Sequence, residues 1–352
     1  MNYHLVYTQD RWEIPAFHVS REESITPQKK KILRLSVQLL LVLVVFYFLG
    51  KKIYEGWPSI TSYDWNFQIP WLVASLLLMS GLYVGHSCGW LIILWRFRHP
   101  VPALPGIYVW FKSLIARYVP GNVLMVMGRV MMIQPYGVPK RISLTSVAYE
   151  QALLAASAST AVALALPFWS ELQNISGLIW LVLIVPPIAI VSLHPAVLGR
   201  LGNYALKKAG REPIEDFLPF TDIILMFLYY SFFWIVAGLG LFAMVRTVTY
   251  ISPSDLPVVL ASTPLAWLTS VLFFISPSGL GVREGVYAAT LGFAFRDAFP
   301  NDYGSIASAF ALVIRFWQTL VEVGLVLVVM GIVKVRHLRI RAAETVESEG
   351  QP

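Results

Sequence analysis

Residues Ser276–Gly285 read SPSGLGVREG and lie between two strongly apolar stretches. This segment places glycines, a proline, an arginine and a glutamate where a membrane helix would be expected to continue. Glycine and proline interrupt helices, and the backbone N–H groups that a break frees cannot face lipid. The segment therefore predicts a helix break that lines a polar cavity, with Arg283 facing inward. The alternative is a turn at the membrane interface, where Arg283 and Glu284 contact water.

The composition of the whole chain predicts an all-α protein that crosses a membrane several times. Of the 352 residues, 57% are hydrophobic and only 13% are charged, and the mean hydropathy is +0.65. Soluble domains have a far more polar balance. The apolar runs, such as Leu35–Leu49 and Gly324–Val333, are continuous. A membrane β-barrel would instead show short strands of alternating polarity.

The apolar runs predict about eight crossings, each of about 20 residues where the run is long enough. They are expected between Arg34 and Lys51 and at residues 70–95, 142–166, 175–193, 221–245, 256–275, 283–295 and 305–333.

Another apolar segment, Leu104–Ile133, is divided by Pro120-Gly121, and each half is short for a crossing. It predicts a re-entrant or broken pair of helices. The interrupted elements RYVPG and SPSGLGVRE lie one in each half of the chain. This placement is expected of a duplicated transporter architecture with an inverted repeat.

The same pattern predicts the domains and the orientation. Residues 1–30 are expected to form a polar cytoplasmic tail, residues 31–333 the membrane domain, and residues 334–352 a basic juxtamembrane strip with a disordered end. With both termini inside the cell, most lysines and arginines fall on the cytoplasmic side, as the positive-inside rule requires. We therefore expect an integral protein of the plasma membrane.

The second interruption carries a candidate anion site. A half-helix that begins near Gly281 would direct its N-terminal amides, with their partial positive charge, toward a ligand beside Arg283. Such a site suits a phosphate or a carboxylate. Glu284 is expected to hold Arg283 in place or to form an ion pair with it.

The first interruption repeats this chemistry, because Arg117 and Arg129 flank the Pro120-Gly121 break. Arginine binds phosphate oxygens in pairs and stays charged when it is partly desolvated. Convergence of the two interruptions would create one anion pocket. The alternative is an in-plane helix whose Lys112, Arg117 and Arg129 extend to cytoplasmic headgroups.

Three further ionisable residues lie at membrane depth. Glu150 is expected to pair with an arginine of a break, since an isolated carboxylate there is costly. Arg315 and Glu322 lie on roughly one face of the last crossing, two turns apart. Together with Arg283 and Glu284 these residues predict one buried network, and a purely structural role for it is the main alternative.

The sequence provides no signature of enzymatic or nucleic-acid chemistry. It lacks a Gly-x-Ser-x-Gly elbow, a Walker A loop, a His-Glu-x-x-His motif and a Cys-x-x-Cys motif. Its only cysteine, Cys88, lies in an apolar run. The net charge of +7 arises mostly from basic residues that flank apolar runs, which argues against nucleic-acid binding. We therefore expect no enzyme activity of the chain's own and no cofactor.

The pairing of RYVPGN and the following GR with SPSGLGVREG resembles the flippase-like transmembrane domain of lysylphosphatidylglycerol synthases and its stand-alone relatives. The resemblance covers roughly Lys31–Val333. It implies a helical bundle with re-entrant segments that moves a lipid between leaflets. The residues that match the motifs are Arg117, Pro120, Gly121 and Arg129 in the first, Gly279, Gly281, Arg283 and Glu284 in the second, and Glu150 in the following span.

Two departures from the family pattern affect what the resemblance implies. Members often have Gly-Gly where this chain has Ser278-Gly279. The sequence also contains no soluble aminoacyl-transferring domain, so synthesis of a lysyl-lipid is not implied.

These features together predict a lipid translocase, in which Arg117, Arg129 and Arg283 hold a headgroup phosphate while the acyl chains stay in the bilayer. The alternative is a membrane enzyme or enzyme subunit that acts on a phospholipid or polyprenyl-phosphate lipid, with Glu150 or Glu284 as base. A third class is a scaffold that packs against other membrane proteins. The expected partners are a lipid with an anionic headgroup, an enzyme that makes or consumes it, and a second copy of the chain.

Overall fold

The computed structural model describes residues 47, 50–51, 54–55, 57–62, 67–118, 123–169, 177–208, 217–273 and 279–349. The α-helices in this part of the chain are α2 (Trp57–Ser62), α3 (Ile69–Arg96), α4 (Ala103–Leu114), α5 (Val123–Ile133), α6 (Lys140–Ala165), α7 (Leu178–Ser192), α8 (Pro195–Lys208), α9 (Phe220–Arg246), α10 (Leu256–Leu272), α11 (Val282–Ala294) and α12 (Tyr303–Glu349). The 3₁₀ helices are η1 (Ile115–Tyr118), η2 (Gln134–Tyr136), η3 (Leu166–Phe168) and η5 (Pro253–Asp255). None of the residues named above forms a strand, and the all-α class is confirmed.

Five helical segments within the described ranges are long and apolar enough to cross a membrane. They are α3, α6 with η3, η5 with α10, α9, and the first part of α12 up to Arg336. The chain is therefore a polytopic helical membrane protein. Each of these segments coincides with an expected crossing.

Two expected crossings are shorter than a bilayer core. At 1.5 Å per residue, α7 with 15 residues and α11 with 13 span about 22 and 20 Å, against about 30 Å of hydrocarbon. The first expected crossing, before Lys51, lies almost wholly outside the described residues.

The broken pair expected at 104–133 is present as α4 and α5. These helices have 12 and 11 residues, so each covers little more than half of a bilayer core. They pack against each other and are connected through η1. Pro120 and Gly121 themselves lie outside the described residues.

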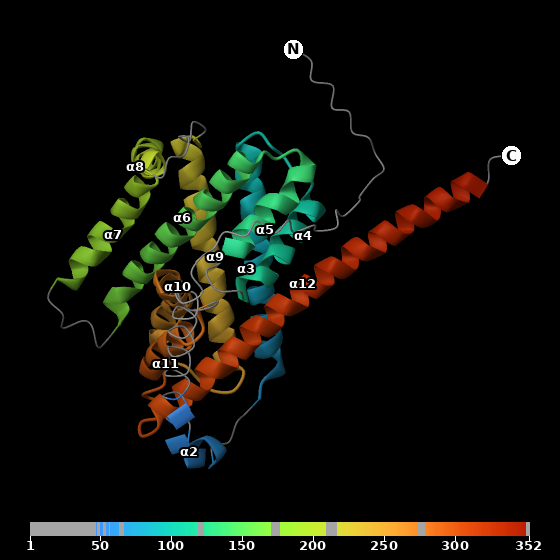
Figure 1. Cartoon of the computed structure of the whole chain (residues 1–352). Helices are drawn as coiled ribbons and strands as arrows, with labels where there is room; N and C mark the ends of the chain where they lie inside the picture. The colour runs from blue at the N-terminus through green and yellow to red at the C-terminus, as the bar shows by residue number, and fades with distance from the viewer. Residues whose placement is uncertain are drawn as a thin grey trace, which may run out of the picture.

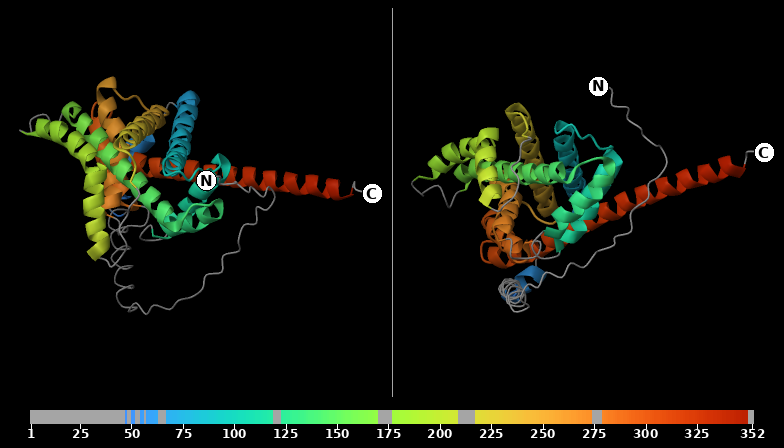
Figure 2. Two further views of the ribbon diagram at one scale, coloured as in Figure 1. Left: turned by 90° about the horizontal axis from the view of Figure 1, so that it is seen from above. Right: turned by 45° about the horizontal axis from the view of Figure 1, so that its top comes forward.

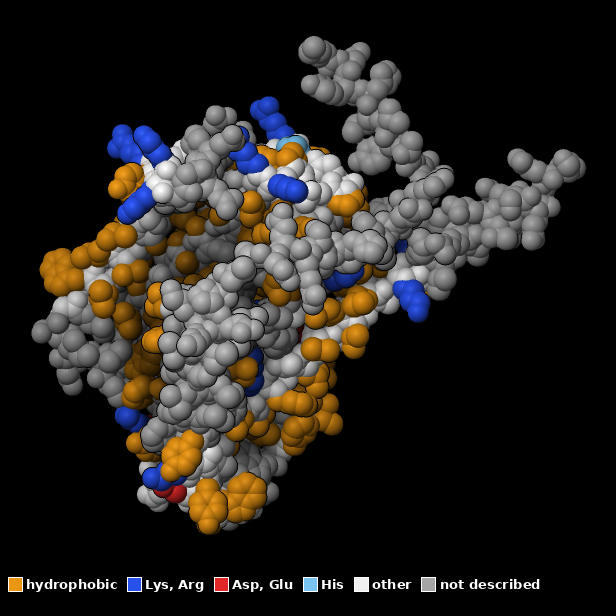
Figure 3. Space-filling view, in the orientation of Figure 1, with side chains coloured by type: hydrophobic (Ala, Val, Ile, Leu, Met, Phe, Trp, Pro, Cys, Tyr) orange, Lys and Arg blue, Asp and Glu red, His pale blue; other side chains and the backbone are white. Residues whose placement is uncertain are grey.

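The remaining helices form a bundle around α9, which packs along α3 and also against α6 and α10 (Figure 1). Helix α11 packs between α10 and α12, and α12 also contacts α4. Lysine and arginine side chains gather at the end of the molecule that carries α8, whereas hydrophobic side chains cover much of its sides (Figure 3). A polar end and apolar sides are the surface expected of a protein embedded in a bilayer.

Helix α12 continues beyond Val333. The helix has 47 residues and continues to Glu349, and its last turns extend clear of the bundle (Figures 1 and 2). Between Gly331 and Gly350 the sequence contains neither proline nor glycine and is rich in Arg, Ala and Glu. These are residues that favour a helix, so the charged composition did not prevent one.

Close contact between α9 and α10 depends on Gly238. A Cβ atom at this position would lie 2.5 Å from the Cα atom of Leu260, which is backbone and cannot rotate away. We expect Gly238→Ala to lower the free energy of unfolding by about 1–3 kcal/mol, because overpacking forces the helices apart. Thermal unfolding in detergent measures this effect.

Gly240 provides the matched control on the same helix. A Cβ atom there would meet only ordinary contacts, at 3.4 Å from the Cβ atom of Leu78. Gly240→Ala should leave the melting temperature unchanged or raise it, since alanine favours a helix more than glycine does. Equal destabilisation by both substitutions would contradict this account of the α9–α10 contact.

Candidate functional site

The second interruption forms a tight turn at the start of α11. Gly279 and Gly281 have φ angles of +68° and +85°, a region that L side chains rarely adopt. A Cβ atom on Gly279 would also lie 2.5 Å from the Cβ atom of Ser270 on α10. The glycines therefore set both the course of the turn and its distance from α10.

Glu284 is fully buried and closes this turn. Its Oε2 atom accepts a hydrogen bond of 2.7 Å from the backbone N–H of Gly281, which caps α11. Its Oε1 atom lies 3.4 Å from Nε of Arg315 on α12. The amide that was expected to face an anion is thus occupied by Glu284, and the ion-pair partner of Glu284 is Arg315.

Arg283 has different partners from those expected. Its Nε atom donates a hydrogen bond of 3.2 Å to Oγ of Ser270. No carboxylate among the described residues lies within ion-pair distance of its guanidinium, which interacts electrostatically with those of Arg117 and Arg315. Arg283 therefore keeps an uncompensated positive charge in a partly buried position.

The first interruption contributes Arg117, which lies in η1 and pairs with α12. Its Nη1 atom lies 3.3 Å from Oε2 of Glu322. The same carboxylate oxygen accepts a hydrogen bond of 3.2 Å from the hydroxyl of Tyr83 on α3. The side chains of Arg117 and Glu322 are 16% and 6% exposed, so this ion pair is largely shielded from solvent.

The two interruptions therefore converge on α12. Three guanidinium groups and two carboxylates meet there, which leaves an excess of one positive charge. We call this set the arginine cluster, and it consists of Arg117, Arg283, Arg315, Glu284 and Glu322. Such an excess in a partly buried site favours an anion.

Arg129 and Glu150 form a separate pair between α5 and α6. Their side chains are 2% and 1% exposed, and Nη1 of Arg129 contacts Oε2 of Glu150 directly. Nε1 of Trp110 donates a hydrogen bond of 2.9 Å to Oε1 of Glu150, and Nε of Arg129 donates one of 3.2 Å to Oγ of Ser113. The guanidinium also lies over the ring of Trp90, at 5.0 Å from its centroid. Glu150 was expected to pair with an arginine of a break, and its partner is Arg129, which follows the first break.

The single network expected from the sequence is thus divided in two. Arg129 and Glu150 satisfy each other together with groups of α4, whereas the arginine cluster links η1, α11 and α12. The expected grouping of Glu150 with the other ionisable residues was wrong, because a fully buried carboxylate pairs with the nearest guanidinium.

Four polar residues of the site were not predicted. Tyr83, Trp110, Ser113 and Ser270 each form a hydrogen bond with a charged side chain, and each lies in a mainly apolar helix. A single hydroxyl or indole in a membrane helix is common and carries no positional signal. Only the pairing of helices reveals which of them meets a charge.

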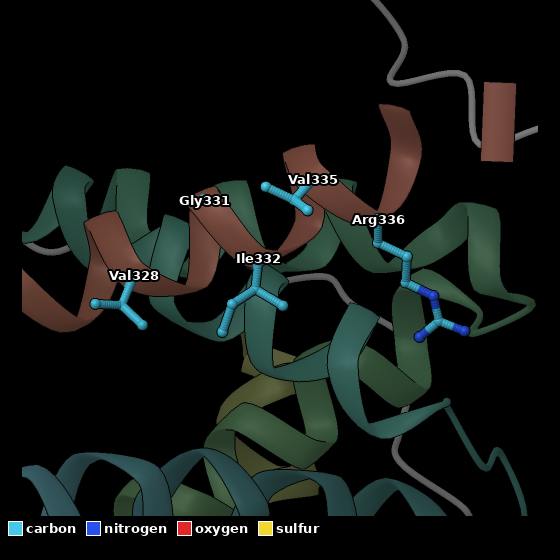
Figure 4. A pocket seen from close by; sticks show the side chains of 5 residues that line it. All are labelled: Val328, Gly331, Ile332, Val335 and Arg336. Carbon is cyan, nitrogen blue, oxygen red and sulfur yellow. The ribbon is translucent and has the colours of Figure 1, made fainter. Parts of the chain in front are cut away.

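Two cavities lie elsewhere in the molecule. One, of about 230 Å³, lies between α6, α9 and α10 and is lined by residues such as Thr160, Ser231 and Leu260. The other, of about 550 Å³, lies beside α12, where Val328, Ile332 and Arg336 point to the same side of the helix (Figure 4). The arginine cluster lines neither of them, since its guanidiniums are in direct contact with carboxylates and hydroxyls.

Comparison with known proteins agrees with this architecture. The sequence pattern of one family, described as the lysylphosphatidylglycerol synthase TM region, matches residues 32–325. A search of curated proteins found no match to the chain. The match covers both interruptions and most of the membrane helices, so the chain belongs to the family of the lysylphosphatidylglycerol synthase TM region.

Proposed function

We propose that this protein is a lipid flippase that moves a phosphate-bearing lipid between the leaflets of the plasma membrane, with both termini in the cytoplasm. Membership of a family defined by a lipid-associated membrane region supports a role in lipid handling. The proposal assigns the headgroup to the arginine cluster and leaves the acyl chains in the bilayer.

The observation that carries the proposal is the charge of Arg283. Its guanidinium lies in a membrane protein at a helix break and has two further guanidiniums within electrostatic range. Among the described residues, its hydrogen bond is to the hydroxyl of Ser270. Burial of an uncompensated positive charge is costly, and a site that tolerates this cost is commonly functional. A phosphate diester carries one negative charge, which would lie next to this guanidinium.

The geometry also supports movement of the bound headgroup. Gly279 and Gly281 have positive φ angles, which glycine adopts readily. Such positions can absorb the changes in backbone dihedral angles that reorient a short helix. Reorientation of α11 would carry Arg283 with it. The headgroup would thereby be exposed first to one leaflet and then to the other.

Reconstitution of the purified protein tests the proposal directly. Vesicles that contain a fluorescent phosphatidylglycerol are treated with a membrane-impermeant quencher, and the accessible fraction is followed with time. We expect the protein to raise the accessible fraction above the half expected for the outer leaflet alone, since lipid from the inner leaflet becomes exposed. Lipids without a phosphate cross the bilayer unaided, so they are unsuitable as a matched control. Vesicles without protein serve as the control instead.

The same vesicles separate transport from chemistry. Mass spectrometry of the recovered lipid should show its covalent structure unchanged. A changed mass without movement between leaflets would contradict the flippase and favour a membrane enzyme. An accessible fraction equal to that of empty vesicles, with unchanged lipid, would remove both functions for this lipid.

A further inference from the structure

The two carboxylate oxygens of Glu322 have different surroundings. Oε2 lies 3.3 Å from Nη1 of Arg117 and accepts the hydrogen bond of Tyr83. Oε1 is buried and has no hydrogen-bond partner among the described residues. Oε1 of Glu284 also lacks a hydrogen-bond partner among the described residues, but it lies 3.4 Å from Nε of Arg315. The carboxylate of Glu322 therefore depends on one guanidinium for the compensation of its charge.

A lipid phosphate at the arginine cluster would compete with Glu322 for that guanidinium. Arginine binds phosphate oxygens in the same geometry in which it binds a carboxylate. When Arg117 turns toward the phosphate, the charge of Glu322 loses its partner while the residue stays buried. An unpaired buried carboxylate is strongly unfavourable, and the simplest relief is the uptake of a proton.

We propose that Glu322 takes up one proton from water when an anionic lipid headgroup binds to Arg117 and Arg283, so that lipid binding and proton binding are coupled. The proposal rests on the proposed function and specifies how its site is regulated. The ion pair between Arg117 and Glu322 is exchanged for a pair between Arg117 and phosphate. The net charge of the site then stays constant, because one negative charge enters and another is neutralised.

Among the described residues, the groups placed against Glu322 are Tyr83 of α3 and Arg117 of η1, and Arg283 of α11 lies within electrostatic range of both. The elements that pack on α12 also carry His86 on α3, Lys112 on α4, Glu284 and Tyr287 on α11, and Asp222 and Arg246 on α9, and α12 itself carries Arg315. Several are already engaged: Lys112 lies over the ring of Tyr108, Arg315 pairs with Glu284, and Tyr287 accepts a hydrogen bond from Gln318.

The coupling sets the sign of the pH dependence. If binding takes up one proton, lower pH favours the bound state, and affinity rises by up to about tenfold for each pH unit while free Glu322 is ionised. Substitution by glutamine imitates the protonated carboxyl and should remove this slope. Its amide oxygen still accepts the hydrogen bond of Tyr83.

The test uses short-chain phosphatidylglycerol and the full-length protein in detergent. Calorimetric titration in two buffers of different ionisation enthalpy gives the number of protons taken up per bound lipid. We expect about one for the wild-type protein and none for Glu322→Gln, which should still bind. Asp222→Asn is the matched control, because this carboxylate pairs with Arg96 at the start of α9, and it should retain the wild-type uptake.

The outcomes separate this inference from the proposed function. Lipid binding by the wild-type protein without proton uptake would overturn the coupling and leave the flippase untouched. Unchanged uptake in a folded Glu322→Gln variant would assign the proton to another group and likewise overturn it. If the Glu322→Gln variant selectively loses the binding of lipids with an amine headgroup, Oε1 would be an ammonium site and the proton coupling would be overturned. Failure of the wild-type protein to bind would overturn the proposed anion site and the coupling with it.

Discussion

Arg283→Ala is expected to reduce protein-dependent movement of fluorescent phosphatidylglycerol to the level of empty vesicles. The substitution removes the guanidinium that has no carboxylate partner within the described part of the chain, and Ser270 provides no charge in its place. Truncation of one partner of a buried charge pair costs about 2–5 kcal/mol, which corresponds to a loss of roughly 30-fold or more in binding. Rates from the leaflet assay, measured at equal protein content, give this effect.

Two variants determine whether that loss reflects binding. Arg283→Lys keeps the charge but loses paired contacts to phosphate oxygens, so it should retain intermediate activity. Arg200→Ala removes an exposed arginine of α8 and should transport at the wild-type rate. Wild-type rates in a well-folded Arg283→Ala protein would rule out the arginine cluster as the headgroup site.

The sequence alone predicted the class of fold and the two interruptions, because the bilayer imposes strict limits on helix length and polarity. The division of Leu104–Ile133 into α4 and α5 followed from Pro120-Gly121, and the start of α11 from the glycines before Arg283. The sequence also predicted that Glu150 pairs with an arginine of a break, because a buried carboxylate requires a cation, but it did not indicate that this arginine is Arg129.

The pairing within the arginine cluster was not accessible from the sequence. Glu284 is adjacent to Arg283, but side chains one residue apart on a helix point in different directions. Glu284 instead folds back to cap Gly281 and contacts Arg315. The partner of Arg117, Glu322, lies far along the chain, and only the packing of α12 beside η1 and α3 brings the two together.

Arg129→Ala is expected to cause the largest loss of stability. The substitution leaves Glu150 buried at 1% exposure with Trp110 as its remaining hydrogen-bond donor. Removal of one partner from a buried ion pair costs about 3–5 kcal/mol, and the lost packing of the guanidinium on Trp90 adds to this. The melting temperature in detergent should fall accordingly, and the yield of folded protein should decrease.

A double variant separates the structural contribution of this pair from a role in headgroup binding. Arg129→Met with Glu150→Gln replaces both charges, while the glutamine oxygen still accepts the hydrogen bond of Trp110. Because an intact apolar or neutral replacement avoids the unpaired charge, this protein should recover much of the stability that Arg129→Ala loses. It should also move lipid at close to the wild-type rate if the pair is structural, as its near-complete burial indicates. A stable double variant without transport would instead place Arg129 and Glu150 in the path of the headgroup, because restored folding would leave binding as the function that was lost.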